Sequence, residues 1–203
     1  YRLTYKAQKY FPIQGDWTFR IRSEIGFGDS YGSTAELPFF RNFRAGGVGS
    51  VRGFTSNSLG PKGVLRMDRN DYNLDGVINE DDFKWVADNN SMGGNLLTEA
   101  SMELVFPLPF VEDQRSMRSV LFVDAGNVFD TNCYALTETD ATGVSAHPAC
   151  NEGFDVDELR IGAGVSLTWI TAIGPLTFTF SRDLKSKDED ETEGFEFSLG
   201  QVF

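Results

Sequence analysis

Apolar and polar residues alternate along seven short segments of the chain, and this alternation constrains the fold more than any other feature. The clearest segment is 159–169, where apolar residues occupy the odd positions and glycine, hydroxyl or arginine residues occupy the even positions. A period of two is typical of a β-strand with two unlike faces. The sequence therefore predicts an all-β fold without a long helix, and its strands are expected at 1–12, 16–28, 95–106, 119–128, 159–169, 176–181 and 195–203.

The polar faces of these strands carry charge. In the segment 16–28, Arg20, Arg22 and Glu24 occupy successive positions on one face, opposite aromatic and aliphatic residues. A hydrated interior suits such a face as well as bulk water does, so this pattern alone leaves both environments open. No apolar run approaches the ~18 residues of a membrane helix. The formal net charge of -12 argues against nucleic acid as a partner. Much of the acid lies in 68–88 and 183–193, which we interpret as loop charge.

The connections between the predicted strands alternate between short turns and long loops, the long ones being 29–94, 130–157 and 183–194. All the long loops must then project from one end of the sheet. Together with strands that are polar inside and apolar outside, this asymmetry is typical of an outer-membrane barrel, which must close because lipid cannot satisfy backbone groups. We expect 1–203 to form the C-terminal portion, about seven antiparallel strands, of one larger transmembrane barrel. A water-soluble antiparallel sheet is the alternative.

The longest connection, 29–94, contains a glycine-rich stretch that ends in Val51-Arg52-Gly53-Phe54. Glycines permit tight turns and close backbone approach, and a single arginine is presented between apolar neighbours. We interpret this stretch as a loop that inserts into another part of the protein, with a free linker as the alternative. No strand–helix unit surrounds the glycines, so they do not predict a phosphate cradle.

The insert at 68–88 has the spacing of an EF-hand calcium loop. Gly76 occupies the position of the sharp turn, and the last ligand is an aspartate where glutamate is usual. We predict a structural Ca²⁺ that orders an exposed loop, with a short helix beginning at Phe83; a solvated turn cluster is the alternative. The predicted oxygen ligands are Asp71, Asn73, Asp75, the carbonyl of Val77, Asn79 and Asp82.

Cys133 and Cys150 are the only cysteines and fall in one polar segment. Such a pair predicts a local disulfide in an oxidising compartment, with two free thiols as the alternative. His147 is the only histidine, which argues against a histidine metal cluster or a Ser-His-Asp triad. We therefore predict no catalytic residue, no catalytic cofactor and no enzyme activity.

Several motifs resemble the BamA family, whose members are central subunits of the machinery that assembles outer-membrane barrels. In this family the connection 29–94 corresponds to loop six, and the strands and periplasmic POTRA domains upstream of the last part of the barrel are not contained in 1–203. The resemblance spans nearly the whole chain in the right order, apart from the tips of the long loops. It rests on residues 43–47, 50–54, 59–62, 100–103, 122–126, 173–176 and 195–203.

The resemblance implies that loop six folds back into the barrel and that Arg52 meets Glu103 and Asp124 on the inner wall. The alternation of the strands agrees, because both acids fall on the polar side, opposite Leu104 and Val123. A guanidinium presents a rigid fork that suits carboxylates. We interpret the three residues as a latch, with three ordinary hydrated charges as the alternative.

The last strand resembles the family's lateral seam, which zips only partly to the first strand and can open sideways. An incompletely paired strand can capture an extended peptide by strand addition, and a glycine permits the strand to bend. The residues expected to form the seam are Phe195, Phe197, Leu199, Gly200 and Phe203.

The resemblance further implies a function and partners. The function is the folding and insertion of β-barrel proteins into the bacterial outer membrane. The partners are unfolded outer-membrane β-barrel proteins, assembly lipoproteins bound through the POTRA domains, the lipid bilayer and lipopolysaccharide, but no nucleic acid. The alternatives are TamA or a two-partner secretion transporter of the same architecture, and, from a different class, a passive porin or an adhesin-like barrel.

Overall fold

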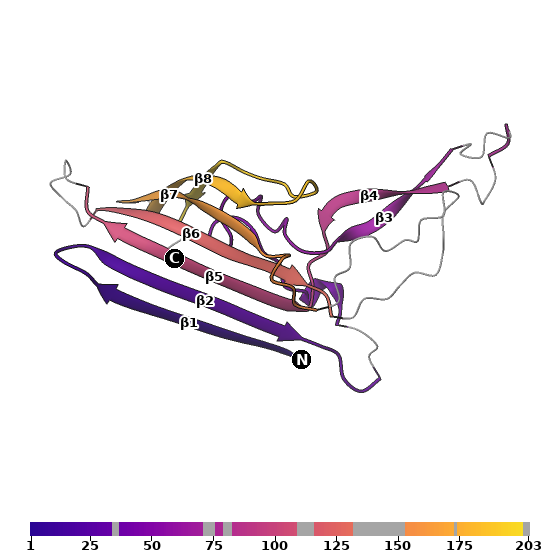
Figure 1. Cartoon of the computed structure of the whole chain (residues 1–203), viewed down its shortest axis with the longest axis horizontal. Helices are drawn as coiled ribbons and strands as arrows, with labels where there is room; N and C mark the ends of the chain where they lie inside the picture. Colours follow the sequence, from indigo (N-terminus) through magenta and orange to yellow (C-terminus); the bar gives the residue numbers. More distant parts are fainter. Residues whose placement is uncertain are drawn as a thin grey trace.

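The structure is a computed structural model in which residues 1–33, 37–70, 76–78, 83–108, 116–131, 153–172 and 174–200 are described, with only the backbone described at 63–69 and 83–89. Its main element is one antiparallel sheet of seven strands in the order β1-β2-β5-β6-β7-β8-β9 (Figure 1). These strands are β1 (Arg2–Pro12), β2 (Thr18–Gly28), β5 (Leu96–Phe106), β6 (Met117–Phe129), β7 (Arg160–Thr171), β8 (Gly174–Lys185) and β9 (Phe195–Leu199).

The strands that the alternation predicted are all present, and each pairs antiparallel with the next of them along the chain. The long connections leave the sheet at one end, on the right of Figure 1, and the short turns lie at the other, as predicted from connection length. The sheet remains open, with β1 and β9 at its two edges. The only helix among the described residues is the short 3-10 helix η1 (Phe39–Arg41), and none there is long and apolar enough to cross a membrane.

The two faces of the sheet have opposite character. Met102 and Val123 are 55% and 45% exposed, whereas their sequence neighbours Glu103 and Asp124 are 3% and 0% exposed. A water-soluble sheet buries its apolar face and exposes its charged one. Here that order is reversed, as the interpretation of a polar interior and an apolar exterior requires, and the water-soluble alternative is wrong.

The helix predicted to begin at Phe83 is not formed. That segment is instead strand β4 (Phe83–Ser91), which pairs antiparallel with β3 (Lys62–Arg69) in a separate two-stranded sheet. The stretch Phe83-Lys84-Trp85-Val86 contains two aromatic residues and one β-branched residue, and such residues favour a pleated backbone. Pairing with β3 supplies hydrogen-bond partners along one edge of each strand. This hairpin extends beyond the long-loop end of the main sheet (Figure 1).

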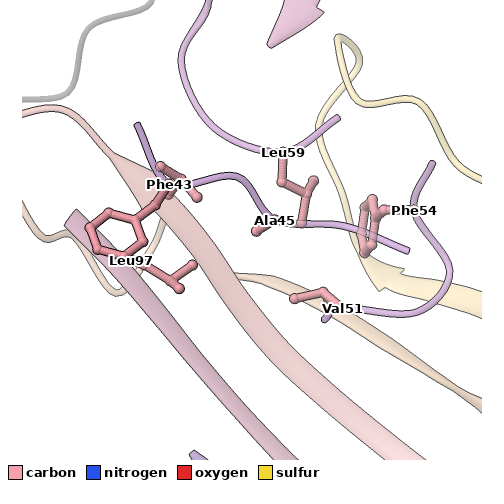
Figure 2. Packing of buried hydrophobic residues seen from close by; sticks show 7 residues of the cluster. Phe43, Ala45, Val51, Phe54, Leu59 and Leu97 are labelled. Carbon is pink, nitrogen blue, oxygen red and sulfur yellow. The ribbon is translucent and has the colours of Figure 1, made fainter. Parts of the chain in front are cut away.

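An apolar core lies between loop six and the inner face of the sheet. Phe43, Ala45, Val51, Phe54 and Leu59 from the loop pack with Leu97 and Val128 from β5 and β6 (Figure 2). Backbone bridges Phe43–Gly94 and Ala45–Leu59 hold the loop segments together around this core. Loop six is therefore anchored on the wall as a packed element and is not a free linker.

Phe43 tests how far this core anchors the loop. Its ring is buried, covered by the Arg2 guanidinium at 3.8 Å from the ring centroid. Phe43→Ala should lower the free energy of unfolding by about 3–5 kcal/mol, because it leaves a cavity. The matched control is Phe40→Ala, whose ring is exposed. Urea unfolding in detergent micelles measures both, and equal losses in the two variants would contradict the packing role.

Candidate functional site

The motif 51–54 lies at the tip of a tight turn in loop six. The amide of Gly47 donates to the carbonyl of Val51 at 3.1 Å, and the amide of Ser50 donates to the carbonyl of Gly47 at 3.1 Å. Gly53 has a φ of +98°, a conformation that residues with a Cβ rarely adopt. We refer to residues 46–56 as the tip hairpin. Its geometry presents the Arg52 side chain toward the wall.

Arg52 meets both predicted carboxylates. Its Nε donates to Asp124 Oδ2 at 2.6 Å, and its Nη2 donates to Asp124 Oδ1 at 2.9 Å and to Glu103 Oε1 at 2.8 Å. The Arg52 backbone amide also donates to Asp124 Oδ2 at 3.2 Å. Arg52 is only 8% exposed. This two-pronged contact is the fork geometry that guanidinium and carboxylate favour.

Burial opposes the charge on Arg52, but the hydrogen bonds and negative charges of Asp124 and Glu103 outweigh it and raise the pKa of the guanidinium above its ordinary value. The side chain therefore stays charged wherever its carboxylates are ionised. Breaking a buried pair by removing one partner leaves an uncompensated charge, which is more costly than losing an exposed pair.

Three further residues complete the cluster and were not singled out from the sequence. Arg20 on β2 pairs with Glu103 at 2.5 Å, and the Ser101 hydroxyl donates to Asp124 Oδ1 at 2.6 Å. The Phe122 ring lies beneath the Arg52 guanidinium, 3.5 Å from its centroid, in a cation–π contact. With Arg20 included, the cluster holds two guanidinium and two carboxylate groups. It is therefore neutral as a unit.

Strand register explains how these residues meet. Arg20 lies opposite Glu103 across β2 and β5, and Ser101 lies opposite Asp124 across β5 and β6. The alternation put Arg20, Ser101 and Glu103 on polar faces, but which residues lie opposite one another depends on register, which alternation does not fix.

Glycines on the inner wall let the tip hairpin approach. A Cβ added at Gly162 on β7 would lie 1.9 Å from the carbonyl oxygen of Arg52, and one added at Gly126 on β6 would lie 3.0 Å from Val51. Any larger residue at Gly162 would have to displace hairpin backbone. The small residues on the polar face of β7 thus form the surface on which the hairpin rests.

A second set of polar contacts fixes the hairpin near Gly49 and Ser50. Arg22 donates to the Gly49 carbonyl at 2.7 Å. The Ser50 hydroxyl donates to the half-buried carboxylate of Glu99 and accepts from the Gly46 amide at 2.9 Å. Arg22 and Glu99 both come from the polar faces of their strands. The wall therefore contacts the hairpin at Arg52 and also at the residues just before it.

The predicted seam residues lie on β9, at one edge of the sheet. The outward rings of Phe195 and Phe197 pack against Phe180 and Phe178 of β8, with centroids 5.1 and 5.3 Å apart. Within the described part of the chain β9 pairs only with β8 and ends at Leu199. Gly200 follows with a φ of +81°, and its amide donates to the Pro175 carbonyl at 2.9 Å. Phe203 lies outside the described residues.

Most residues of the predicted calcium site and the predicted disulfide lie outside the part of the chain that the structure describes. These are Asp71, Asn73, Asp75, Asn79, Asp82, Cys133 and Cys150. Val77 is exposed, and Gly76 has a φ of +85°, which agrees with a sharp turn at the sixth position. Among the described residues, no three His, Cys, Asp or Glu side chains converge as a metal site.

Known proteins are similar to this chain in sequence and in fold. A family model described as the Omp85 superfamily domain matches residues 1–203. The chain is 36% identical over 208 residues to the outer membrane protein assembly factor BamA of Neisseria meningitidis. This alignment covers 100% of this chain and 24% of that protein. It is 23% identical over 170 residues to BamA of Nitratidesulfovibrio vulgaris, covering 83% of this chain and 16% of that protein.

A solved structure agrees with these matches. The crystal structure of BamA from Haemophilus ducreyi lacking POTRA domains 1-3 is similar with a TM-score of 0.76 and 29% identity, over 97% of this chain and 34% of that chain. The open seven-stranded sheet is thus similar to part of a BamA barrel, as the motif resemblance predicted. The alternation and the connection lengths predicted an outer-membrane barrel, and this is confirmed. The chain spans 24% of the length of the first of these relatives.

Gly162 offers a test of the hairpin's docking surface. Gly162→Ala should displace the tip hairpin, because the new methyl would meet the Arg52 carbonyl oxygen. Limited proteolysis of loop six should then become about tenfold faster, equivalent to a loss of about 1.4 kcal/mol of docking free energy. The control is Gly194→Ala, where the nearest atom lies at an ordinary contact distance of 3.5 Å. Unchanged proteolysis in Gly162→Ala would show that the hairpin does not depend on this contact.

Proposed function

The chain belongs to the Omp85 superfamily, and from that premise we propose that it is the C-terminal part of the barrel of an outer-membrane assembly factor. In this proposal the complete protein folds β-barrel proteins and inserts them into the outer membrane. The observation that carries the proposal is the buried contact of Arg52 with Glu103 and Asp124, in a chain 36% identical to an assembly factor along its whole length.

The proposed mechanism is templating at the β9 edge. Unpaired backbone groups along an edge strand accept a further strand from an extended polypeptide. A bilayer that is locally thinner beside this strand would lower the barrier to insertion. Incoming strands would pair at this edge, where the barrier to insertion is lowered.

The proposed role of the Arg52 cluster is to hold the tip hairpin inside the barrel as a latch. The neutral set of two arginines and two carboxylates is enclosed between the hairpin and β2, β5 and β6. Loss of one partner from such a buried set costs roughly 3–5 kcal/mol. The latch would keep the inner wall and the seam in one arrangement while clients pair and leave.

The proposed setting is the bacterial outer membrane, with the long loops extracellular and the C-terminus periplasmic. The proposed partners are unfolded outer-membrane β-barrel proteins, assembly lipoproteins bound through POTRA domains, lipid and lipopolysaccharide. No chemical step is assigned to the cluster, because its two carboxylates are paired with Arg20 and Arg52.

Two other functions would fit the architecture. A TamA-like protein or a two-partner secretion transporter would share the hairpin, and POTRA number and lumen width distinguish them. A passive porin or adhesin barrel has no need for a clamped loop. Ion conductance that is large and unaffected by Arg52→Ala would favour the porin.

Depletion and rescue test the proposed function. In cells depleted of the natural-length protein, Arg52→Ala should fail to restore assembly, because Glu103 and Asp124 lose their shared partner. Unassembled outer-membrane proteins should accumulate several-fold, as measured by immunoblotting of unfolded porins. Arg41→Ala is the matched control, since this exposed arginine lies in the same loop outside the cluster. Full rescue by Arg52→Ala, at equal protein level, would contradict the latch.

We also propose that the insert at 68–88 binds a structural Ca²⁺, on the strength of its EF-hand spacing and the positive φ of Gly76. Calcium should slow proteolysis of the insert, and Asp71→Ala should abolish that protection because it removes the first ligand. Protease digestion with calcium or with chelator measures the effect. Equal digestion of the unsubstituted protein under both conditions would remove the proposal.

The pair Cys133 and Cys150 remains a predicted disulfide. If formed, it would constrain the loop 130–157 by roughly 3 kcal/mol in the chain-entropy model. An oxidising compartment would suit this bridge.

A further inference from the structure

The connection between β8 and β9, residues 186–194, lies directly against the tip hairpin. We call this connection the strap. The Thr55 amide donates to the Glu191 carbonyl at 2.8 Å, and the Glu193 amide donates to the Gly53 carbonyl at 3.1 Å. Phe54 and Thr192 form an antiparallel bridge between these two bonds. The strap is thus paired, backbone to backbone, with the segment that follows Arg52.

A buried arginine at the start of β7 holds the other side of the strap. Arg160 Nε lies 2.5 Å from Asp190 Oδ2, and its Nη2 donates to Asp190 Oδ1 at 3.2 Å. The Asp190 side chain is only 1% exposed. Asp190 also accepts from the Lys187 amide at 2.7 Å, which fixes a turn within the strap. A fork of this kind sets orientation as well as distance.

Acidic and basic neighbours complete this second network. Arg160 Nη1 donates to the carbonyl oxygen of Glu158 at 2.8 Å and to its carboxylate at 3.1 Å, and Lys187 binds the same carboxylate. Partial burial raises the pKa of Glu158, but the hydrogen bonds and charges of Lys187 and Arg160 outweigh it and hold that pKa below its ordinary value. Glu189 lies 3.8 Å from Arg160 at the exposed rim.

This network is separate from the Arg52 cluster. Its acids are Glu158, Glu189 and Asp190, whereas those of the Arg52 cluster are Glu103 and Asp124. In the described part of the chain the two networks share no ion pair, and they are linked by the backbone bonds between the hairpin and the strap. Arg160 and Gly162 are successive inward positions of β7, so one side of that strand carries the strap and then the Arg52 carbonyl. Phe195, the first residue of β9, lies five positions after Asp190, a reach of at most about 18 Å.

We propose that Arg160 is a positioning residue that clasps the strap onto the tip hairpin, so that the hairpin and the seam strand β9 move as one unit. The relevance of this clasp to client pairing at β9 rests on the proposed function. The contact itself, which holds the strap on the hairpin, does not depend on that function. While Arg160 holds Asp190, the start of β9 stays beside the hairpin, and release of the clasp frees both.

Amide hydrogen exchange of the natural-length protein in detergent micelles tests the clasp. In Arg160→Gln, exchange at the Thr55 and Glu193 amides should become at least tenfold faster, and the β9 amides bonded to β8 should also lose protection. The β5–β6 amides and the Arg52 amide should be unchanged. Arg182→Gln is the matched control, because that arginine on β8 is exposed and belongs to neither network.

Companion variants separate a clasp from a merely structural role. Asp190→Asn should reproduce the effect, and adding it to Arg160→Gln should give little further change, because both remove one contact. Arg160→Lys should restore part of the protection. Unchanged exchange at Thr55 and Glu193 in Arg160→Gln would overturn the clasp, as would faster exchange throughout the sheet. Faster strap exchange with unaltered β9 exchange would overturn the link to the seam.

Failure of the clasp can be distinguished from failure of the proposed assembly function. If depletion and rescue reveal no assembly activity while the exchange results stand, the clasp is retained and the assembly function is lost. If assembly activity is present and the exchange results fail, the converse holds.

Discussion

The structure depends on one electrostatic constraint: the inner wall of the sheet is charged, and something of matching charge must cover it. Glu103 and Asp124 are almost fully buried on that wall, where isolated carboxylates would be very costly. Arg20 alone cannot balance both. Arg52 supplies the second positive charge, and to do so loop six must fold back against the sheet. The apolar core beneath the loop (Figure 2), the glycines on β6 and β7, and the tight turn before Arg52 all support that arrangement.

Much of the fold follows from local chemistry. Alternation located each strand of the main sheet and assigned Glu103 and Asp124 to the inner face, because a period of two fixes facing whatever the tertiary structure. Connection length placed the long loops at one end. The resemblance to a family named Arg52 as their partner. Register was beyond reach, since Arg20 and Ser101 join the cluster only because β2, β5 and β6 align as they do.

One interpretation from sequence failed for a physical reason. Phe83 begins a strand because a neighbouring segment, β3, offers it backbone partners that a local pattern does not reveal. The acidic segment 183–193 lies mostly in a loop, as interpreted, but one of its acids, Asp190, is enclosed by Arg160. Both contacts join segments that are separated along the chain. An acidic residue in a loop is solvated by default, and only a partner supplied by another element changes that.

The glycines of the inner wall, Gly126 and Gly162, limit how the sequences of loop six and of the wall can change. The hairpin fits because the wall beneath it has glycines at 126 and 162, where a side chain would meet the hairpin. The shape of the wall is therefore complementary to the shape of the hairpin. A change in loop six and a change in β6 or β7 are therefore not independent. If loop six were exchanged between relatives without the glycines of β6 and β7, the loop and the wall would not be complementary. Transferring the loop together with these strands would preserve the fit.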